Sequence, residues 1–128
     1  MKMTLISLFV GFSLMGAMTT GFTHHSEVMF SDEEITVSGV VKEFQYTNPH
    51  SWILVDVTSE DGTVTTWGFE AGGPTTMMRN GIRRRDFAPG TRLTITGRPM
   101  ADGRPAVVWS KAVREDGKEF YARGQPSR

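Results

Sequence analysis

Apolar and polar positions alternate along most of the chain after residue 34, and a period of two predicts β-strands. From Ile35 the apolar side chains fall on every second residue, and beyond Gly39 the alternation continues as far as Tyr46 with its phase shifted. A phase shift beside a glycine is typical of a β-bulge, which lets one long strand take part in two sides of a strongly curved sheet. The segment 35–46 is therefore predicted to be one bent strand with a bulge at Gly39.

A hairpin is predicted next. Residues 52–57 and 64–70 are rich in β-formers, and the segment 59–62 between them has turn composition, with a glycine available for positive φ. Pro74 and Gly81 delimit a short helix, because proline suits the first turn of a helix and glycine ends one. Further strands are predicted over 91–98, 105–113 and, briefly, 119–121.

The order of these elements predicts the fold. Five strands, with a bulge in the first and a short helix between the third and the fourth, match the OB-fold, a small, partly open, all-β barrel. Trp52, Trp67 and Trp109 lie on three different strands, and we expect each to pack in the core or at the rim of the barrel.

The first 23 residues predict where the protein is located in the cell. Lys2 precedes an apolar stretch over 5–18, which is the pattern of a bacterial export signal and is shorter than the roughly 20 apolar residues of a membrane-spanning helix. We expect a signal peptide over 1–23, cleaved after Gly21 or after Thr23. Residues 24–128 then form one OB-like domain with a partly flexible start, periplasmic or secreted, whose membrane contact is limited to the signal segment before cleavage.

Composition narrows the classes of function. The chain has no cysteine, so packing, a metal or a partner has to hold an exported domain of this size together. Its 14 basic residues balance its 14 acidic residues, and a near-neutral exported chain is not expected to bind nucleic acid. The sequence contains no Ser-His-Asp arrangement and no phosphate-binding glycine motif, and no catalytic residue is predicted.

All three histidines lie in two short motifs, His24-His25-Ser26 and Asn48-Pro49-His50-Ser51-Trp52. Imidazole is a common ligand of copper, zinc and nickel, and a cysteine-free exported protein that binds such an ion relies on His and carboxylates. The sequence therefore predicts a metal site made by His24, His25 and His50, with copper favoured over zinc or nickel.

The cleavage position decides the geometry of this site. If His24 is the first residue, its amine and ring chelate Cu(II) together, and His25 or His50 completes the set. If Phe22 is the first residue, the amine, two backbone amides and the His24 ring form a square-planar site for Cu(II) or Ni(II). A structural alternative stays open, in which the His pair is solvated and His50 hydrogen-bonds a carbonyl at a turn.

These motifs together carry a resemblance to a known family. The residues that carry it are 24–26, 39–44, 47–52, 67–70 and the turn at 89–90. Over nearly the whole mature chain they resemble a family of short exported bacterial proteins described as a domain of unknown function. Members of that family usually carry an Ala-x-Ala-type ending directly before the His pair, where this chain has Gly21-Phe22-Thr23. The resemblance implies an exported protein but gives no activity.

A second class of function is a binding module without a metal. OB barrels commonly use one open face and its loops to hold ligands. The residues predicted to contact a periplasmic protein partner or a small ligand are Trp52, Trp67, Glu70, Arg83, Arg84 and Arg85, with Tyr46 and Phe69 extending the aromatic surface. For the arginines, a solvated loop after Gly81 is the structural alternative.

Overall fold

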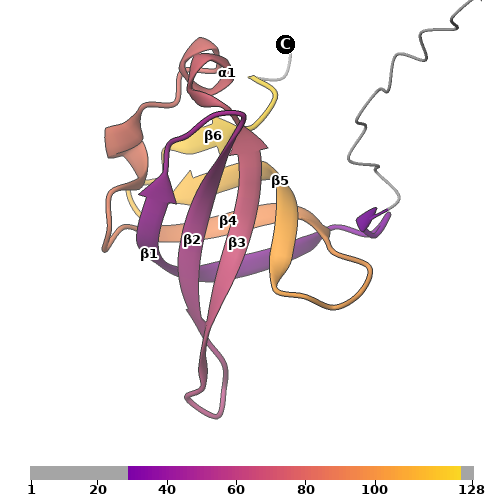
Figure 1. Ribbon diagram of the computed structural model, residues 1–128. Helices are drawn as coiled ribbons and strands as arrows, with labels where there is room; N and C mark the ends of the chain where they lie inside the picture. Colours follow the sequence, from indigo (N-terminus) through magenta and orange to yellow (C-terminus); the bar gives the residue numbers. More distant parts are fainter. Residues whose placement is uncertain (1–28, 125–128) are drawn as a thin grey trace, which may run out of the picture.

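The computed structural model describes residues 29–124 and forms a small β-barrel (Figure 1). The predicted signal peptide over 1–23 and the histidines His24 and His25 lie outside the described residues. Within 29–124, no helix is both long and apolar enough to cross a membrane. The elements are β1 (Ile35–Gln45), β2 (His50–Thr58), β3 (Val64–Gly72), α1 (Pro74–Arg79), the 3-10 helix η2 (Arg84–Phe87), β4 (Arg92–Pro99), β5 (Ala106–Arg114) and β6 (Glu119–Tyr121).

The strand order confirms the predicted OB-like barrel. Antiparallel neighbours follow the order β3, β2, β1, β4, β5 and β6, and a parallel pairing of β3 with β5 closes the barrel. This closing seam is short, since it joins Gly68, Phe69 and Glu70 to the segment 106–108. The helix α1 follows β3, as predicted, and the three-residue β6 adds to the edge of β5.

The long first strand is shared between two sides of the barrel. Its residues 35–40 pair with β4 and its residues 40–45 pair with β2, so β1 bends through the sheet (Figure 1). The bulge predicted at Gly39 is wrong by three positions, because the extra residue is Lys42. Gly39 has a different reason to be glycine: a Cβ at this position would lie 2.4 Å from the carbonyl oxygen of Asp56.

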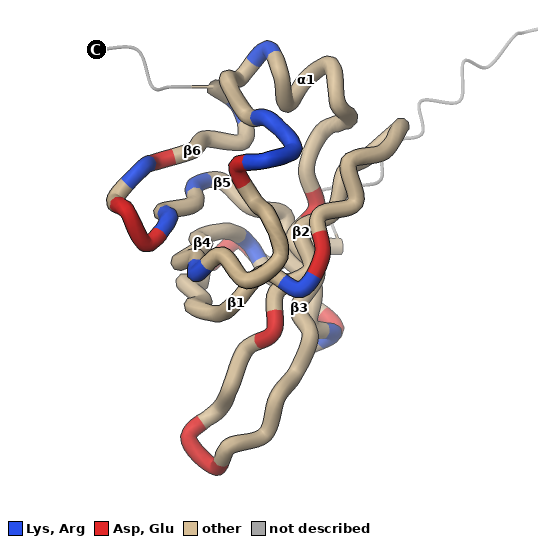
Figure 2. The backbone as a smooth tube through the Cα atoms, turned by 90° about the vertical axis from the view of Figure 1, so that its left-hand side faces the viewer, with Lys and Arg blue, Asp and Glu red and all other residues tan. Residues whose placement is uncertain are grey.

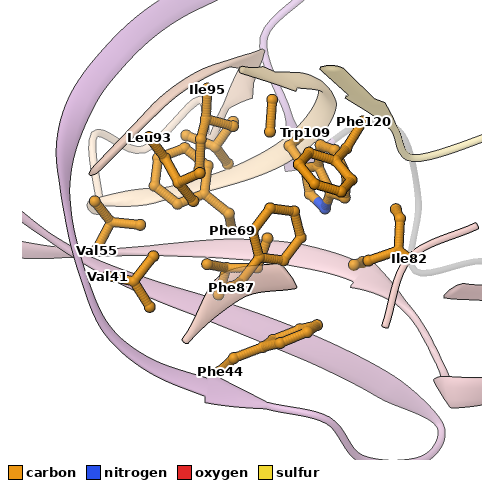
Figure 3. Packing of buried hydrophobic residues seen from close by; sticks show 14 of the residues in the cluster. Val41, Phe44, Val55, Phe69, Ile82, Phe87, Leu93, Ile95, Trp109 and Phe120 are labelled. Atoms are coloured by element: carbon orange, nitrogen blue, oxygen red, sulfur yellow. The ribbon is translucent and has the colours of Figure 1, made fainter. Parts of the chain in front are cut away.

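The core is a layer of aliphatic side chains joined to a cluster of aromatic rings (Figure 3). Phe87 lies at the centre of this cluster, where its ring centroid is 4.8 Å from that of Phe120, 5.3 Å from that of Phe44 and 6.2 Å from that of Trp109. Trp109 is 3% exposed, and its indole N–H has no hydrogen-bond partner among the described residues. The aromatic cluster therefore closes the end of the barrel beside η2.

Phe87 reaches the core because Arg84–Phe87 form η2, capped by Arg83, a helix that the sequence pattern did not predict. The carboxylate of Asp86 accepts a hydrogen bond from the backbone N–H of Arg83 at 2.8 Å. The same carboxylate lies 3.1 Å from Lys118 Nζ and 3.4 Å from Arg114 Nη1. Burial alone would raise the pKa of Asp86, but the Arg83 N–H, Lys118 and Arg114 together hold this pKa below its ordinary value.

Candidate functional site

A histidine and a glutamate from the two strands of the first hairpin form a pair on the outer face of the barrel. His50 is the first residue of β2, and its Nδ1 contacts Oε1 of Glu70 near the end of β3. Trp52 is directly opposite Glu70 in the sheet, so His50 is the diagonal neighbour of Glu70 on the same face. The side chains of His50 and Glu70 are 42% and 20% exposed, and both are therefore accessible to a ligand.

The loop before β2 holds His50 in place. Thr47 Oγ1 donates a hydrogen bond to the carbonyl of His50 at 3.0 Å, and Ser51 Oγ donates one to the carbonyl of Thr47 at 3.4 Å. The peptide bond between Asn48 and Pro49 is cis. A Cβ at Gly73 would lie only 2.6 Å from Asn48 Oδ1, so the loop packs closely against the connection from β3 to α1. Asn48, Pro49, His50 and Ser51 of the Asn-Pro-His-Ser-Trp motif therefore all take part in the structure of this loop.

Two adjoining hollows meet at the His50–Glu70 pair. The first has a volume of about 530 Å³ and lies between the loop 47–49, Trp52, and the residues Met100 and Arg104 of the β4–β5 loop. The second has a volume of about 350 Å³ and extends over Val108 to Arg98 and Arg123. Phe30, His50 and Glu70 line both hollows. We call the two together the double groove.

Four residues that are cross-strand neighbours in the sheet form a row along the floor of the double groove. Trp52 on β2 is opposite Glu70 on β3. Glu70 is opposite Val108 on β5, and Val108 is opposite Arg98 on β4. Because neighbouring strands lie about 4.8 Å apart, the backbone positions of this row span roughly 14 Å from Trp52 to Arg98, measured along the sheet. The row crosses the seam that closes the barrel.

Only part of the predicted aromatic surface gathers at this site. Trp52 lies on the outer face, where its six-membered ring packs beside Gly68. Trp67 and Phe69 point to the other side of the sheet: Phe69 is fully buried, and Trp67 is half-buried against the core. Tyr46 donates a hydrogen bond to the carbonyl of Pro74 at 3.1 Å, which ties this ring to the start of α1.

The predicted arginine cluster lies elsewhere on the molecule. Arg83, Arg84 and Arg85 are exposed on the connection between α1 and β4, directly before Asp86 (Figure 2). Arg84 and Arg85 line a separate hollow of about 470 Å³, which shares no lining residue with the double groove. The basic residues of the double groove are instead Arg98, Arg104 and Arg123, which the sequence interpretation did not single out.

Within residues 29–124, His50 and Glu70 are the two metal-ligating side chain types that the structure brings together at this site. Among residues 29–124, no three His, Cys, Asp or Glu side chains come together as a metal-binding group. His50 and Glu70 form a pair of such groups, and the predicted ligands His24 and His25 lie outside the described residues. Met29 and Phe30, which follow these histidines in the chain, line the first hollow.

The topology and the position of the double groove define a small OB-like barrel with a hollow on its β2–β3 face, flanked by the β1–β2 and β4–β5 loops. OB-folds bind their ligands at this place. The chain belongs to a family of unknown function, DUF6152, whose family model matches residues 13–108. The matched range contains both histidine motifs. No curated protein and no solved structure gives a significant match to the chain.

Proposed function

We propose that this protein is an exported, non-catalytic binding module that holds a small ligand, or a short segment of a periplasmic partner, in the double groove. The observation that carries the proposal is the His50–Glu70 pair, which sits where the two hollows meet. Ligand sites are typically hollows of about 300–1,000 Å³ with an apolar lining and a few polar groups that fix orientation. Both hollows fall in this range of volume.

The lining of the double groove supports binding more than catalysis. Phe30, Trp52 and Met100 provide apolar surface, and the carboxylate of Glu70 orients the ring of His50. A nucleophile would have to lie within hydrogen-bond reach of His50. Ser51, the adjacent hydroxyl, is fully buried on the core side and donates to the carbonyl of Thr47. The pair is therefore assigned to recognition. The export part of the proposal is supported by the leader sequence over 1–23.

The neutral fluorophore N-phenyl-1-naphthylamine tests this proposal, because its emission rises when it enters an apolar groove. We expect saturable binding at one site, weakened at least tenfold by Trp52→Ala and by His50→Gln. Trp67→Phe is the matched control, since Trp67 packs on the core side of the same hairpin. Binding that is unchanged in the Trp52 and His50 variants would reject the double groove as the site.

Copper binding by His24, His25 and His50 is the second candidate function. Histidines that bind metals commonly have a carboxylate on the other ring nitrogen, as His50 has in Glu70. His25 precedes Met29 by four residues, and an extended chain of this length spans up to about 14 Å. Met29 and His50 line the same hollow, and this is the observation that favours a site shared by His25 and His50.

Intact-mass spectrometry of protein purified from the periplasm, with one equivalent of Cu(II), tests both the export of the chain and its binding of copper. The mass of a chain that begins at His24, shifted by one copper ion, supports a site shared with His50. In that case His50→Ala is expected to lower the Cu(II) affinity at least tenfold. A mass that begins at Phe22, with copper retained after His50→Ala, supports the square-planar amino-terminal site. A mass of the uncut chain contradicts the predicted cleavage, and an apo mass in both forms contradicts the copper function.

A further inference from the structure

We infer that a second copy of this chain docks on the arginine cluster, Arg83 to Arg85, through the acidic tip of its β2–β3 hairpin. The surface concerned is separate from the double groove, and the inference does not depend on the function proposed for that groove. It is carried by two exposed features at opposite ends of the molecule, which are complementary in charge and in apolar surface.

The arginine cluster presents positive charge that the described part of the chain does not pair. Arg83, Arg84 and Arg85 are all exposed, and among residues 29–124 none of them forms an ion pair with a carboxylate. The neighbouring carboxylate of Asp86 is buried and faces two other cations. Glu43 lines the same hollow as Arg84 and Arg85, so one carboxylate is set against three guanidinium groups. The cluster therefore keeps a net positive charge and attracts the carboxylates of a partner.

The surface beside these arginines is concave. Arg84 and Arg85 line the hollow of about 470 Å³, and its apolar lining consists of Phe44, Phe87, Ala88 and Pro89. A flat lipid surface does not enter a hollow, whereas a protruding protein segment does. The shape therefore favours a protein segment that combines a carboxylate for the arginines with an apolar side chain for the hollow.

The turn between β2 and β3 is a segment of this kind. Neither β1 nor β5 pairs with residues 57–66, which are therefore paired in the sheet only with each other. The hairpin consequently projects beyond the barrel, and its tip is acidic (Figures 1 and 2). Glu60 and Asp61 at this tip are exposed, and Val64 close to them is 58% exposed. The tip thus offers both the charge and the apolar side chain that the arginine cluster and its hollow would bind.

The two carboxylates of the tip have different surroundings. Asp61 Oδ1 accepts hydrogen bonds from Ser59 Oγ at 2.6 Å and from the Thr63 N–H at 2.9 Å, which orders the turn. Glu60 makes no side-chain hydrogen bond or ion pair among residues 29–124, so its carboxylate is available to an arginine of another molecule. An ordered tip loses less conformational entropy when it docks.

The hairpin tip and the arginine cluster lie at opposite ends of the barrel, so one molecule does not join them (Figure 2). Two copies can do so, with the tip of one against the cluster of the next. An interface of this kind is heterologous, and a docked pair retains one free tip and one free cluster. Further copies can therefore add to the pair.

Sedimentation velocity of the protein purified from the periplasm, at increasing protein concentration, tests this inference. At low salt we expect the average sedimentation coefficient to rise with concentration past that of a dimer, and high salt should suppress the rise because exposed charges are screened. Arg84→Glu combined with Arg85→Glu, and separately Glu60→Lys, are each expected to weaken the association at least about tenfold, since like charges then meet. Glu33→Lys is the matched control: this exposed glutamate lies outside the hairpin, and its reversal should change the association by no more than about threefold.

A mixture of the two charge-reversed variants decides whether the tip contacts the cluster. The unchanged tip of the arginine variant can meet the unchanged cluster of the Glu60→Lys variant, so the mixture is expected to associate although neither variant does so alone. A mixture that stays monomeric, or association that survives both reversals, would overturn the inference. An unmodified protein that is monomeric at every concentration would also overturn it, and arginine-dependent sedimentation of that monomer with phosphatidylglycerol vesicles would identify a lipid surface as the partner instead. Circular dichroism of each variant verifies that the barrel is intact.

Discussion

The buried carboxylate of Asp86 is expected to stabilise the barrel through its charge. Its side chain is 8% exposed, and it accepts a hydrogen bond from the Arg83 N–H while facing Lys118 and Arg114. Asp86→Asn keeps the shape and one acceptor oxygen but removes the negative charge between the two cations. A hydrogen bond to a charged group contributes about 1.5–3 kcal/mol. We therefore expect a loss of about 2 kcal/mol in the free energy of unfolding near neutral pH.

The pH dependence of this loss has a defined sign. The pKa of Asp86 is lower in the folded protein than its ordinary value of about 3.8. A carboxyl group with a depressed folded pKa contributes stability that is present above the unfolded pKa and is lost as the pH falls through the folded pKa. The difference between the unmodified protein and Asp86→Asn should therefore be constant above about pH 5 and shrink progressively below about pH 4.

Urea unfolding followed by tryptophan fluorescence measures both expectations, at a series of pH values. Asp116→Asn is the matched control: Asp116 also binds Arg114, at 2.6 Å, but its side chain is 53% exposed. Hydrogen bonds from Arg114 and from the Lys118 N–H lower the pKa of Asp116 to about 2. Solvent screens this exposed pair, so a much smaller loss is expected. An Asp86→Asn protein as stable as the unmodified one near neutral pH, or a difference that persists unchanged in acid, would refute the role of the charge.

Four other substitutions have expected costs that follow from packing and exposure, each measured by urea or thermal unfolding. Gly39→Ala should cost about 1–3 kcal/mol because the new Cβ meets the backbone carbonyl of Asp56; an unchanged midpoint would show that β1 and β2 can separate there. Phe87→Ala should cost about 3–5 kcal/mol by emptying the centre of the aromatic cluster. Val64→Thr, at a position 58% exposed, should stay within about 0.5 kcal/mol. Glu70→Gln removes a partly exposed pair and should cost at most about 1 kcal/mol, so a large loss would make the pair structural.

The strands were predictable because one face of each is buried. The alternation over 35–46 predicted β1, found at Ile35–Gln45, and the turn at 59–62 predicted the hairpin of β2 and β3. The bulge position was not predictable from the phase shift alone, since Gly39 is required by the close approach of Asp56. The helix η2 was missed because three successive arginines indicate a solvated loop, while the buried Asp86 and Phe87 follow directly after them.

The candidate site was predictable where it depends on the hairpin and not where it depends on barrel closure. His50 and Glu70 were both named from the sequence, and the pairing of β2 with β3 brings them together. Arg98 joins them only through the pairing of β3 with β5, which connects segments far apart in the chain. Arg123 follows β6, so its place depends on the pairing of β6 with β5. The roles of His24 and His25 remain a prediction.

The short pairing between β3 and β5 couples ligand binding in the double groove to the opening of the barrel. Nine residue pairs join β3 to β2, whereas three join β3 to β5, so the seam is expected to open at a lower free energy than the pairing of β3 with β2. Glu70 of β3 and Val108 of β5 face each other across this seam and both line the second hollow, so we expect a ligand in the double groove to bind the closed barrel more tightly than the opened one. By mass action such a ligand stabilises the closed seam. Its binding should therefore slow amide hydrogen exchange at residues 68–70 and 106–108 first. Exchange rates at these amides can therefore report binding before the ligand has been identified.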